Sequence, residues 1–207
     1  MSKRGRKVQD KWRIKDWYNI NSPSYFGGAL LGSAPCSDPN KMIGRTVETT
    51  LYDITGDFSQ QYMKLYFQVV NIRGNDADTI FKGHEYSRDY LRSLVRRGST
   101  RIDSILNSTT KDGYKLRVSV VAFSVSRVRI SQISTIRDII HNILEEKAKN
   151  LNFDQFIQEA ILGKIASDIY NEAKKITPLR HVGIRKSKLI AYPTGKPEET
   201  VEAEVKL

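Results

Sequence analysis

Several short motifs contain residue types that could support catalysis, and each lacks a group that the chemistry requires. Residues 27–33 have the glycine spacing of a phosphate-binding loop, but Ser33 stands where the phosphate-binding lysine belongs. His84 and Glu85 begin like the helix of a zinc protease, but Arg88 occupies the position of the second imidazole. We therefore interpret residues 27–33 as a flexible loop and predict no cofactor or metal site in either segment.

The remaining reactive side chains fit structural roles better than catalytic ones. Cys36 is the single cysteine, so it can form neither an internal disulfide framework nor a Cys-based zinc site, and a reducing intracellular compartment fits best. No base adjoins it, and we interpret it as an inert loop thiol. His141 and His181 fall in a helical pattern and a basic segment, where packing or RNA contact is favoured, and Glu145 and Glu146 lie on a solvated helix face. We predict no catalytic residue.

The charge of the chain points to a polyanionic partner. Its 207 residues include 34 Lys and Arg against 23 Asp and Glu, a net charge of +11, and such a field concentrates phosphate-rich molecules. Trp12, Trp17 and Tyr18 lie among basic residues near the N-terminus; they could stack on unpaired bases, or they could close the N-terminal segment onto the body. The basic residues of this segment are Lys3, Arg4, Arg6, Lys7, Lys11, Arg13 and Lys15.

The composition predicts a globular protein. Hydrophobic residues make up 39% and charged residues 28% of the chain, enough for a sizeable core and unlike a disordered or fibrous sequence. No apolar run approaches the roughly 20 residues that span a bilayer, and the N-terminus has no apolar signal core. We expect a soluble cytoplasmic protein that is not secreted.

Alternating and β-branched patterns predict strands in the first part of the chain. Residues 43–54, 62–70 and 99–107 have strand character, and Asp112-Gly113 predicts a hairpin turn before a long strand over 114–130. Between them, residues 87–97 predict a short helix that Ser87 caps and that Gly98 ends.

The period then changes from two to about 3.6. This predicts a helix over 131–149, and over 153–176 either one long helix or two joined near Gly163, before a basic strand over 180–190 with Val182 and Ile184 inside. The predicted fold is α+β: an antiparallel barrel or strongly curved sheet with a short helix, followed by C-terminal helices and the basic strand. We divide the chain into a basic N-terminal arm (1–17), an α+β body (18–192; strand-rich 43–130, helical 131–177) and an acidic flexible tail (193–207).

Several segments, in their order and spacing, resemble a known family. They are Lys15-Asp16-Trp17-Tyr18 and the segments at 44–48, 51–54, 81–85, 110–117 and 176–188. The likeness covers about residues 3 to 190, and its strength is collinearity, since no single segment is diagnostic. The chain resembles the archaeal and eukaryotic small-subunit ribosomal protein one, the S-three-a-e family, in an archaeal-like form.

The resemblance implies a non-enzymatic structural constituent of the small ribosomal subunit that supports translation. It implies a place on the platform, near the messenger RNA exit and the 3′ end of the small-subunit rRNA. The implied partners are that rRNA and neighbouring ribosomal proteins, with contact to mRNA or initiation factors also possible. No cofactor, membrane or small-molecule substrate is implied.

The residues that touch RNA are inferred from charge alone. Besides the seven basic residues of the N-terminal arm, they are Arg88, Arg92, Arg96, Arg97, Arg127, Arg129, Arg180, His181, Arg185, Lys186 and Lys188. Arg88, Arg92 and Arg96 are spaced four apart in the helix predicted over 87–97 and should form one ridge on its surface.

Three other classes of function remain open. A free RNA-binding regulatory protein would share the basic face without being stably part of the ribosome. An RNA-modifying enzyme would need a cofactor loop or an acid–base pair, which the sequence does not offer. A membrane-surface protein would need a basic amphipathic helix, whereas the helical stripes here carry mixed charge.

Overall fold

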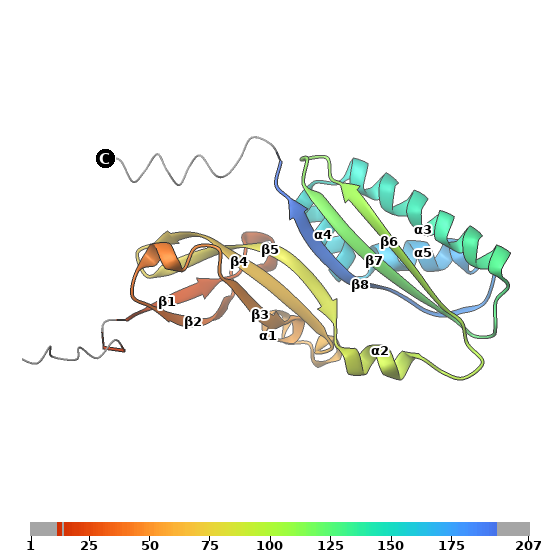
Figure 1. Ribbon diagram of the computed structural model, residues 1–207, viewed down its shortest axis with the longest axis horizontal. Coiled ribbons are helices and arrows are strands. Elements are labelled where there is room, and N and C mark those ends of the chain that lie inside the picture. The colour runs from red at the N-terminus through yellow and green to blue at the C-terminus, as the bar shows by residue number, and fades with distance from the viewer. Residues whose placement is uncertain (1–11, 14, 194–207) are drawn as a thin grey trace, which may run out of the picture. The chain divides into compact units, whose positions relative to one another are not determined.

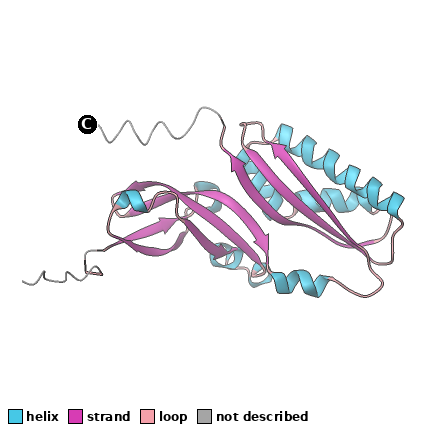
Figure 2. Ribbon diagram, viewed as in Figure 1, coloured by secondary structure: helices cyan, strands magenta, loops and turns pink. Residues whose placement is uncertain are grey.

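The computed structural model describes residues 12–13 and 15–193, which form two compact units (Figure 1). The first unit is built from the described residues up to Val47 and from Phe67–Ile80; the second is built from Glu48–Tyr66 and the described residues from Phe81 onward. Figure 2 shows strands and helices in the fold, which confirms the α+β class. None of the helices in these residues is long and apolar enough to cross a membrane.

Strands and helices do not alternate regularly along the chain. The strands are β1 (Asp16–Asn21), β2 (Leu30–Cys36), β3 (Thr46–Thr50), β4 (Met63–Arg73), β5 (Asp76–Tyr86), β6 (Arg101–Thr109), β7 (Lys115–Ser124) and β8 (Leu179–Ala191). The helices are α1 (Leu51–Thr55), α2 (Arg88–Leu94), α3 (Ile130–Asn150), α4 (Phe153–Ile161) and α5 (Lys164–Ala173).

The strands pair along an open path, so the predicted barrel is wrong. Hydrogen bonds link them in the order β2-β1-β5-β8-β7-β6, and β4 joins β3 to β5 beside this path. Across the described residues the path does not return to its start, and β1 pairs with β5 in parallel. Pro35 lies in β2 and has no N–H to donate, which suits a strand at the end of a sheet.

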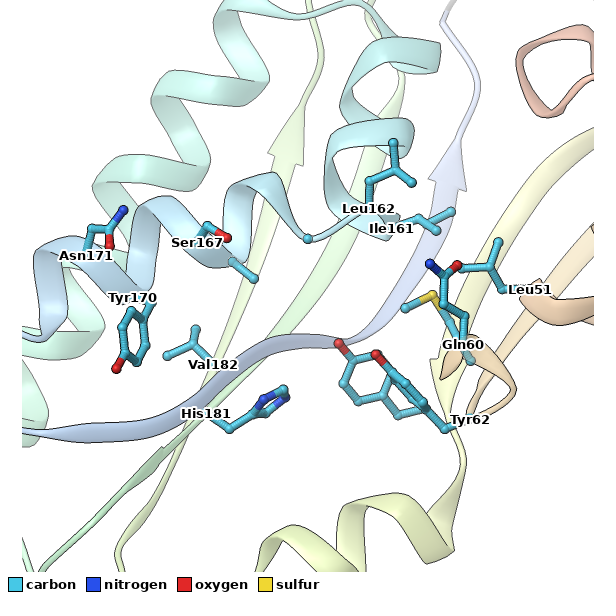
Figure 3. Close-up of a pocket in the computed structure, with 14 residues that line it drawn as sticks. Leu51, Gln60, Tyr62, Ile161, Leu162, Ser167, Tyr170, Asn171, His181 and Val182 are labelled. Carbon is cyan, nitrogen blue, oxygen red and sulfur yellow. The ribbon is translucent and has the colours of Figure 1, made fainter. Parts of the chain in front are cut away.

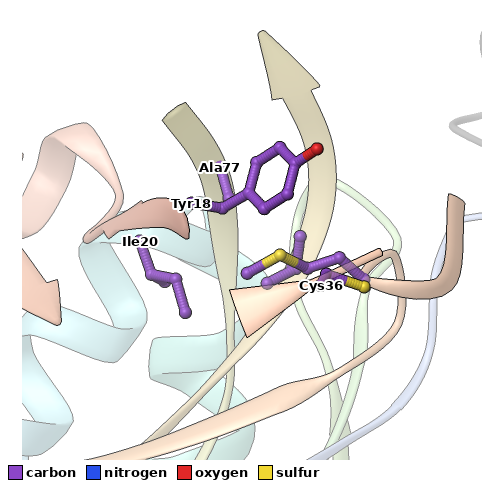
Figure 4. Close-up of a cluster of buried hydrophobic side chains, with 6 residues drawn as sticks. Tyr18, Ile20, Cys36 and Ala77 are labelled. Carbon is purple, nitrogen blue, oxygen red and sulfur yellow. The ribbon is translucent and has the colours of Figure 1, made fainter. Parts of the chain in front are cut away.

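The first unit has its own small core. Tyr18 and Ile20 of β1 pack with Cys36 of β2, Val69 of β4 and Ala77 of β5, together with Met42 (Figure 4). Cys36 is therefore a buried residue at the end of a strand, and its predicted place in a loop is wrong. Residues 30–33 likewise belong to β2, because Leu30–Cys36 pairs along the whole of β1.

In the second unit, helices cover one face of the strands β6, β7 and β8 (Figure 1). The buried residues of α3 are Ile136, Ile140, Leu144 and Ala148, which repeat at three- and four-residue intervals. The predicted run over 153–176 forms two helices, α4 and α5. Gly163 separates them because its positive φ of 82° ends one helix and begins the other.

Local hydrogen bonds override strand propensity at two predicted boundaries. Residues 51–54 form helix α1 instead of continuing a strand, because the Thr50 and Asp53 side chains each accept a hydrogen bond from the other's backbone N–H. This bonding also lowers the pKa of Asp53. The strand predicted over 114–130 ends at Ser124, where the hydroxyl accepts the Thr100 N–H in place of a backbone carbonyl.

Gly83 is required where β5 meets β8. The backbones approach so closely that a Cβ atom at this position would lie 2.4 Å from the carbonyl oxygen of Ser187. We expect G83A to lower the free energy of unfolding by about 1–3 kcal/mol, because backbone atoms must move to admit the methyl group. Urea denaturation measures this, and an unchanged midpoint would contradict the close approach.

Candidate nucleic-acid interface

Part of the face of β6, β7 and β8 opposite the helices is exposed and basic, whereas Ser119, Val121 and Phe123 on the same face of β7 are buried. Arg101, Lys115, Arg117, Lys186 and Lys188 are all exposed there. The next residues along the strands, such as Leu116, Val118 and Leu189, point to the buried side. Arg101, Lys115 and Arg117 are not among the residues predicted from the sequence to contact RNA, because their proximity to Lys186 and Lys188 depends on the pairing of different strands.

Arg117 and Lys188 are direct neighbours on this face. They are register partners in the antiparallel pair of β7 and β8, and side chains so paired share one face of a sheet. Neither forms an ion pair with a carboxylate in the described part of the chain; Arg117 donates a hydrogen bond from Nε to Oδ1 of Asn107, at 2.9 Å. Two cations directly opposite each other repel, and a phosphate between them would relieve that repulsion.

Two other cations of this face are paired within the chain. Lys186 Nζ lies 2.9 Å from a carboxylate oxygen of Glu85, and Arg101 Nε lies 3.0 Å from one of Asp103. Exposed ion pairs of this kind contribute little to stability, about 0–1 kcal/mol. They leave Arg117, Lys115 and Lys188 as the cations most available to an anionic ligand.

Charge is segregated between the two layers of the second unit. Strands β6, β7 and β8 contain seven Lys and Arg residues and one carboxylate, Asp103. Helices α3, α4 and α5 contain seven carboxylates and four Lys and Arg residues. The sheet layer therefore attracts a polyanion far more strongly than the helical layer does.

The predicted arginine ridge is shorter than expected. Helix α2 ends at Leu94, and Val95 has extended backbone angles, so Arg96 and Arg97 lie beyond the helix and only Arg88 and Arg92 share its surface. The predicted cap is also wrong, because the Ser87 side chain makes no capping hydrogen bond and the exit is not at Gly98. The Ser93 hydroxyl donates to the Tyr90 carbonyl and competes with the helical ladder. All four arginines are exposed.

The other residues predicted to contact RNA differ in their exposure to solvent. Arg127 and Arg129 are exposed between β7 and α3. Arg180, His181 and Arg185 are only half-exposed in β8. Arg185 lies where the register of β8 shifts between Ile184 and Lys186, so this strand does not present one continuous basic face.

The N-terminal cations lie largely outside the described residues. This applies to Lys3, Arg4, Arg6, Lys7 and Lys11, and the acidic segment after Pro193 also lies outside. Of the described pair, Lys15 places its Nζ 4.4 Å from the ring centroid of Trp12, and Arg13 is exposed. Trp12 and Trp17 are 60% and 56% exposed and meet edge to face.

A buried histidine links β5 to β8 beneath the basic face. The His84 ring contacts the Ser187 hydroxyl through Nδ1, at 2.7 Å, and the Ile184 carbonyl oxygen through Nε2, at 3.0 Å. Because a carbonyl can only accept, Nε2 carries the proton and Nδ1 accepts from Ser187. Burial lowers the pKa of His84 to about 4, so the ring is neutral at pH 7. His84 lies in strand β5 and has a structural role.

A pocket of about 530 Å³ opens beside the N-terminal part of β8 (Figure 3). Tyr62, Tyr86 and Tyr170 contribute aromatic walls, and His181 lies between Tyr62 and Tyr170 in this view. Tyr90 stacks on Tyr62, with ring centroids 3.8 Å apart, and supports it from outside the lining. Burial raises the pKa of Tyr90 to about 12. This pocket could not be predicted from the sequence, because its residues come from distant segments.

Comparison with known proteins gives a consistent result. The profile of the Ribosomal S3Ae family matches residues 3–193. The chain is 51% identical over 193 residues to the small ribosomal subunit protein eS1 of Sulfolobus acidocaldarius, covering 93% of this chain and 98% of that protein. It is 48% identical over 202 residues to the protein of the same name from Saccharolobus solfataricus, covering 97% of each. The resemblance inferred from the sequence is confirmed.

Proposed function

Because the chain belongs to the Ribosomal S3Ae family, we propose that it is a structural, non-enzymatic constituent of the small ribosomal subunit. In this role it binds rRNA through the exposed basic part of β6, β7 and β8 and so supports translation in the cytoplasm. The names of its relatives, which come mostly from archaea, support this assignment.

The observation that carries the RNA-binding role is the adjacent pair of Arg117 and Lys188. Both side chains are exposed, they repel each other, and neither has a carboxylate partner among the described residues. Phosphate groups spaced along an RNA backbone would neutralise such a pair, with the remaining cations of the sheet on either side. Contacts of this kind position a protein on RNA without reading its sequence.

We extend this proposal to the two terminal segments and to the position of the protein in the small subunit. The basic residues of 1–17 add phosphate contacts, whereas the acidic segment over 193–207 avoids rRNA and faces basic neighbouring proteins. The likeness to the family supports a place on the platform near the mRNA exit, beside other ribosomal proteins and within reach of mRNA and initiation factors. Helices α3, α4 and α5, with their excess of carboxylates, suit contacts with basic proteins better than contacts with rRNA.

We expect the full chain to bind structured RNA with an affinity that falls steeply as salt increases. Each neutralised phosphate releases counterions and adds about −0.7 to −0.9 to the slope of log affinity against log salt concentration. Titrations from low to moderate salt measure this slope, and a flat profile would refute the electrostatic mechanism. Sedimentation of a lysate then separates the two RNA-binding candidates: a ribosomal constituent travels with the small subunit, and a free regulator does not.

A further inference from the structure

Two buried polar atoms that line the pocket beside β8 are positioned to bond to a ligand. The amide nitrogen of Gln60 donates to an Asp57 carboxylate oxygen at 3.2 Å, and this bond holds Oε1 on the other side. Gln60 Oε1 and His181 Nε2 are buried, and neither has a hydrogen-bond partner among the described residues. Buried polar atoms are normally paired, so two unpaired ones lining the same pocket indicate a missing partner.

The shape and the walls of the pocket suit a flat aromatic group. Its volume of about 530 Å³ lies within the range of about 300–1,000 Å³ that is typical of sites for small ligands. Tyr62 and Tyr170 provide ring faces on either side of His181 (Figure 3). Burial and the neighbouring Arg180 lower the pKa of His181, so its ring is neutral and can either donate or accept.

The surroundings of the pocket favour a group that carries phosphate. Arg180 precedes His181 and has a buried guanidinium nitrogen without a partner in the described structure. Lys174 Nζ lies 5.8 Å from the ring centroid of Tyr170. The first turn of α5 contains no carboxylate, and Gly163 and Ala166 at this end of the helix line the pocket.

We propose that this pocket receives an unpaired nucleobase of the bound RNA. Gln60 Oε1 accepts an N–H of the base, His181 Nε2 bonds to its edge, and Tyr62 and Tyr170 flank its ring. Arg180 and the start of α5 face the adjoining phosphates. The inference rests on the proposed RNA-binding function and adds to it a contact with a base, which the exposed basic part of the sheet does not provide. An aromatic side chain of another protein is the competing occupant.

The test compares oligoadenylate with the same oligomer made abasic, using the full chain. Both RNAs retain their phosphates, so the salt-dependent contribution of the sheet is common to them. We expect oligoadenylate to bind about 10-fold more tightly, because stacking of a base contributes strongly and independently of salt. The substitution S167W fills the pocket from an exposed position on α5 and should abolish this preference. The control N142W, at an exposed site on α3, should retain it.

A second measurement uses the wild-type chain, so it does not depend on whether S167W folds. Adenosine carries no phosphate, and in the wild-type chain it should shift the NMR signals of the Gln60 side-chain amide and the His181 ring. Equal binding of the two RNAs, with unchanged signals, overturns the base pocket while leaving salt-dependent RNA binding intact. If S167W then also fails to enter small subunits, the occupant is a protein side chain. A loss of all salt-dependent binding would instead refute the proposed function itself.

Discussion

Replacing both Arg117 and Lys188 by glutamate lowers the affinity of the chain for structured RNA by about 100-fold at low salt. The change converts the central cationic pair of the sheet face into two anions that repel phosphate. The slope of log affinity against log salt concentration should become shallower by about 1.4 to 1.8, since two phosphate contacts are lost. Filter binding or anisotropy over a salt series measures both quantities.

A matched control distinguishes the effect of this sheet face on affinity from the effect of net charge. The double variant K149E/K175E changes the charge of the chain by the same amount, at exposed positions in α3 and two residues after α5. It should retain most of the affinity, because these positions lie in or next to the helical layer. Both double variants should unfold within about 0.5 kcal/mol per substitution of the wild type, as is usual for exposed sites. Equal losses of affinity in the two variants would show that RNA binding depends on overall charge and not on this face.

Acidification should destabilise the fold through His84. The unfolded chain protonates this imidazole near pH 6.5, whereas the folded chain does so only near pH 4. Between these values the unfolded state binds more protons, so the free energy of unfolding falls as the pH is lowered. The expected loss from this residue is about 3 kcal/mol over the whole interval.

The variant H84Q tests this assignment. Its side-chain amide can still donate to the Ile184 carbonyl but does not titrate, so most of the pH dependence between 6.5 and 4 should disappear. At pH 7 the variant should be less stable by about 1–2 kcal/mol, because the bond with the buried Ser187 hydroxyl is perturbed. The variant H141Q, which replaces a half-buried histidine of α3, should keep the wild-type dependence. Any dependence left in H84Q includes His181, whose pKa is also lowered.

Much of the local structure was predictable because hydrophobic periodicity reports it directly. Met63, Leu65, Phe67 and Val69 are all buried along one face of β4, and the Asp112-Gly113 turn joins β6 to β7 as expected. Two predicted strand boundaries failed where a side chain bonded to backbone. The reciprocal hydrogen bonds of Thr50 and Asp53, and the bond from the Thr100 N–H to the Ser124 hydroxyl, lie at these boundaries, and propensity does not register such bonds.

The sequence by itself determined that this chain is basic and that it forms an α+β fold. Only the tertiary structure decided that Arg117 lies opposite Lys188, that His84 joins β5 to β8, and that Gln60 and His181 share a pocket. These pairs are distant along the chain and depend on strand order and register. Register is a global result of packing, because a shift of one residue moves every side chain to the other face. The positions of charges can therefore be read from a sequence, but the sites that they form require the fold.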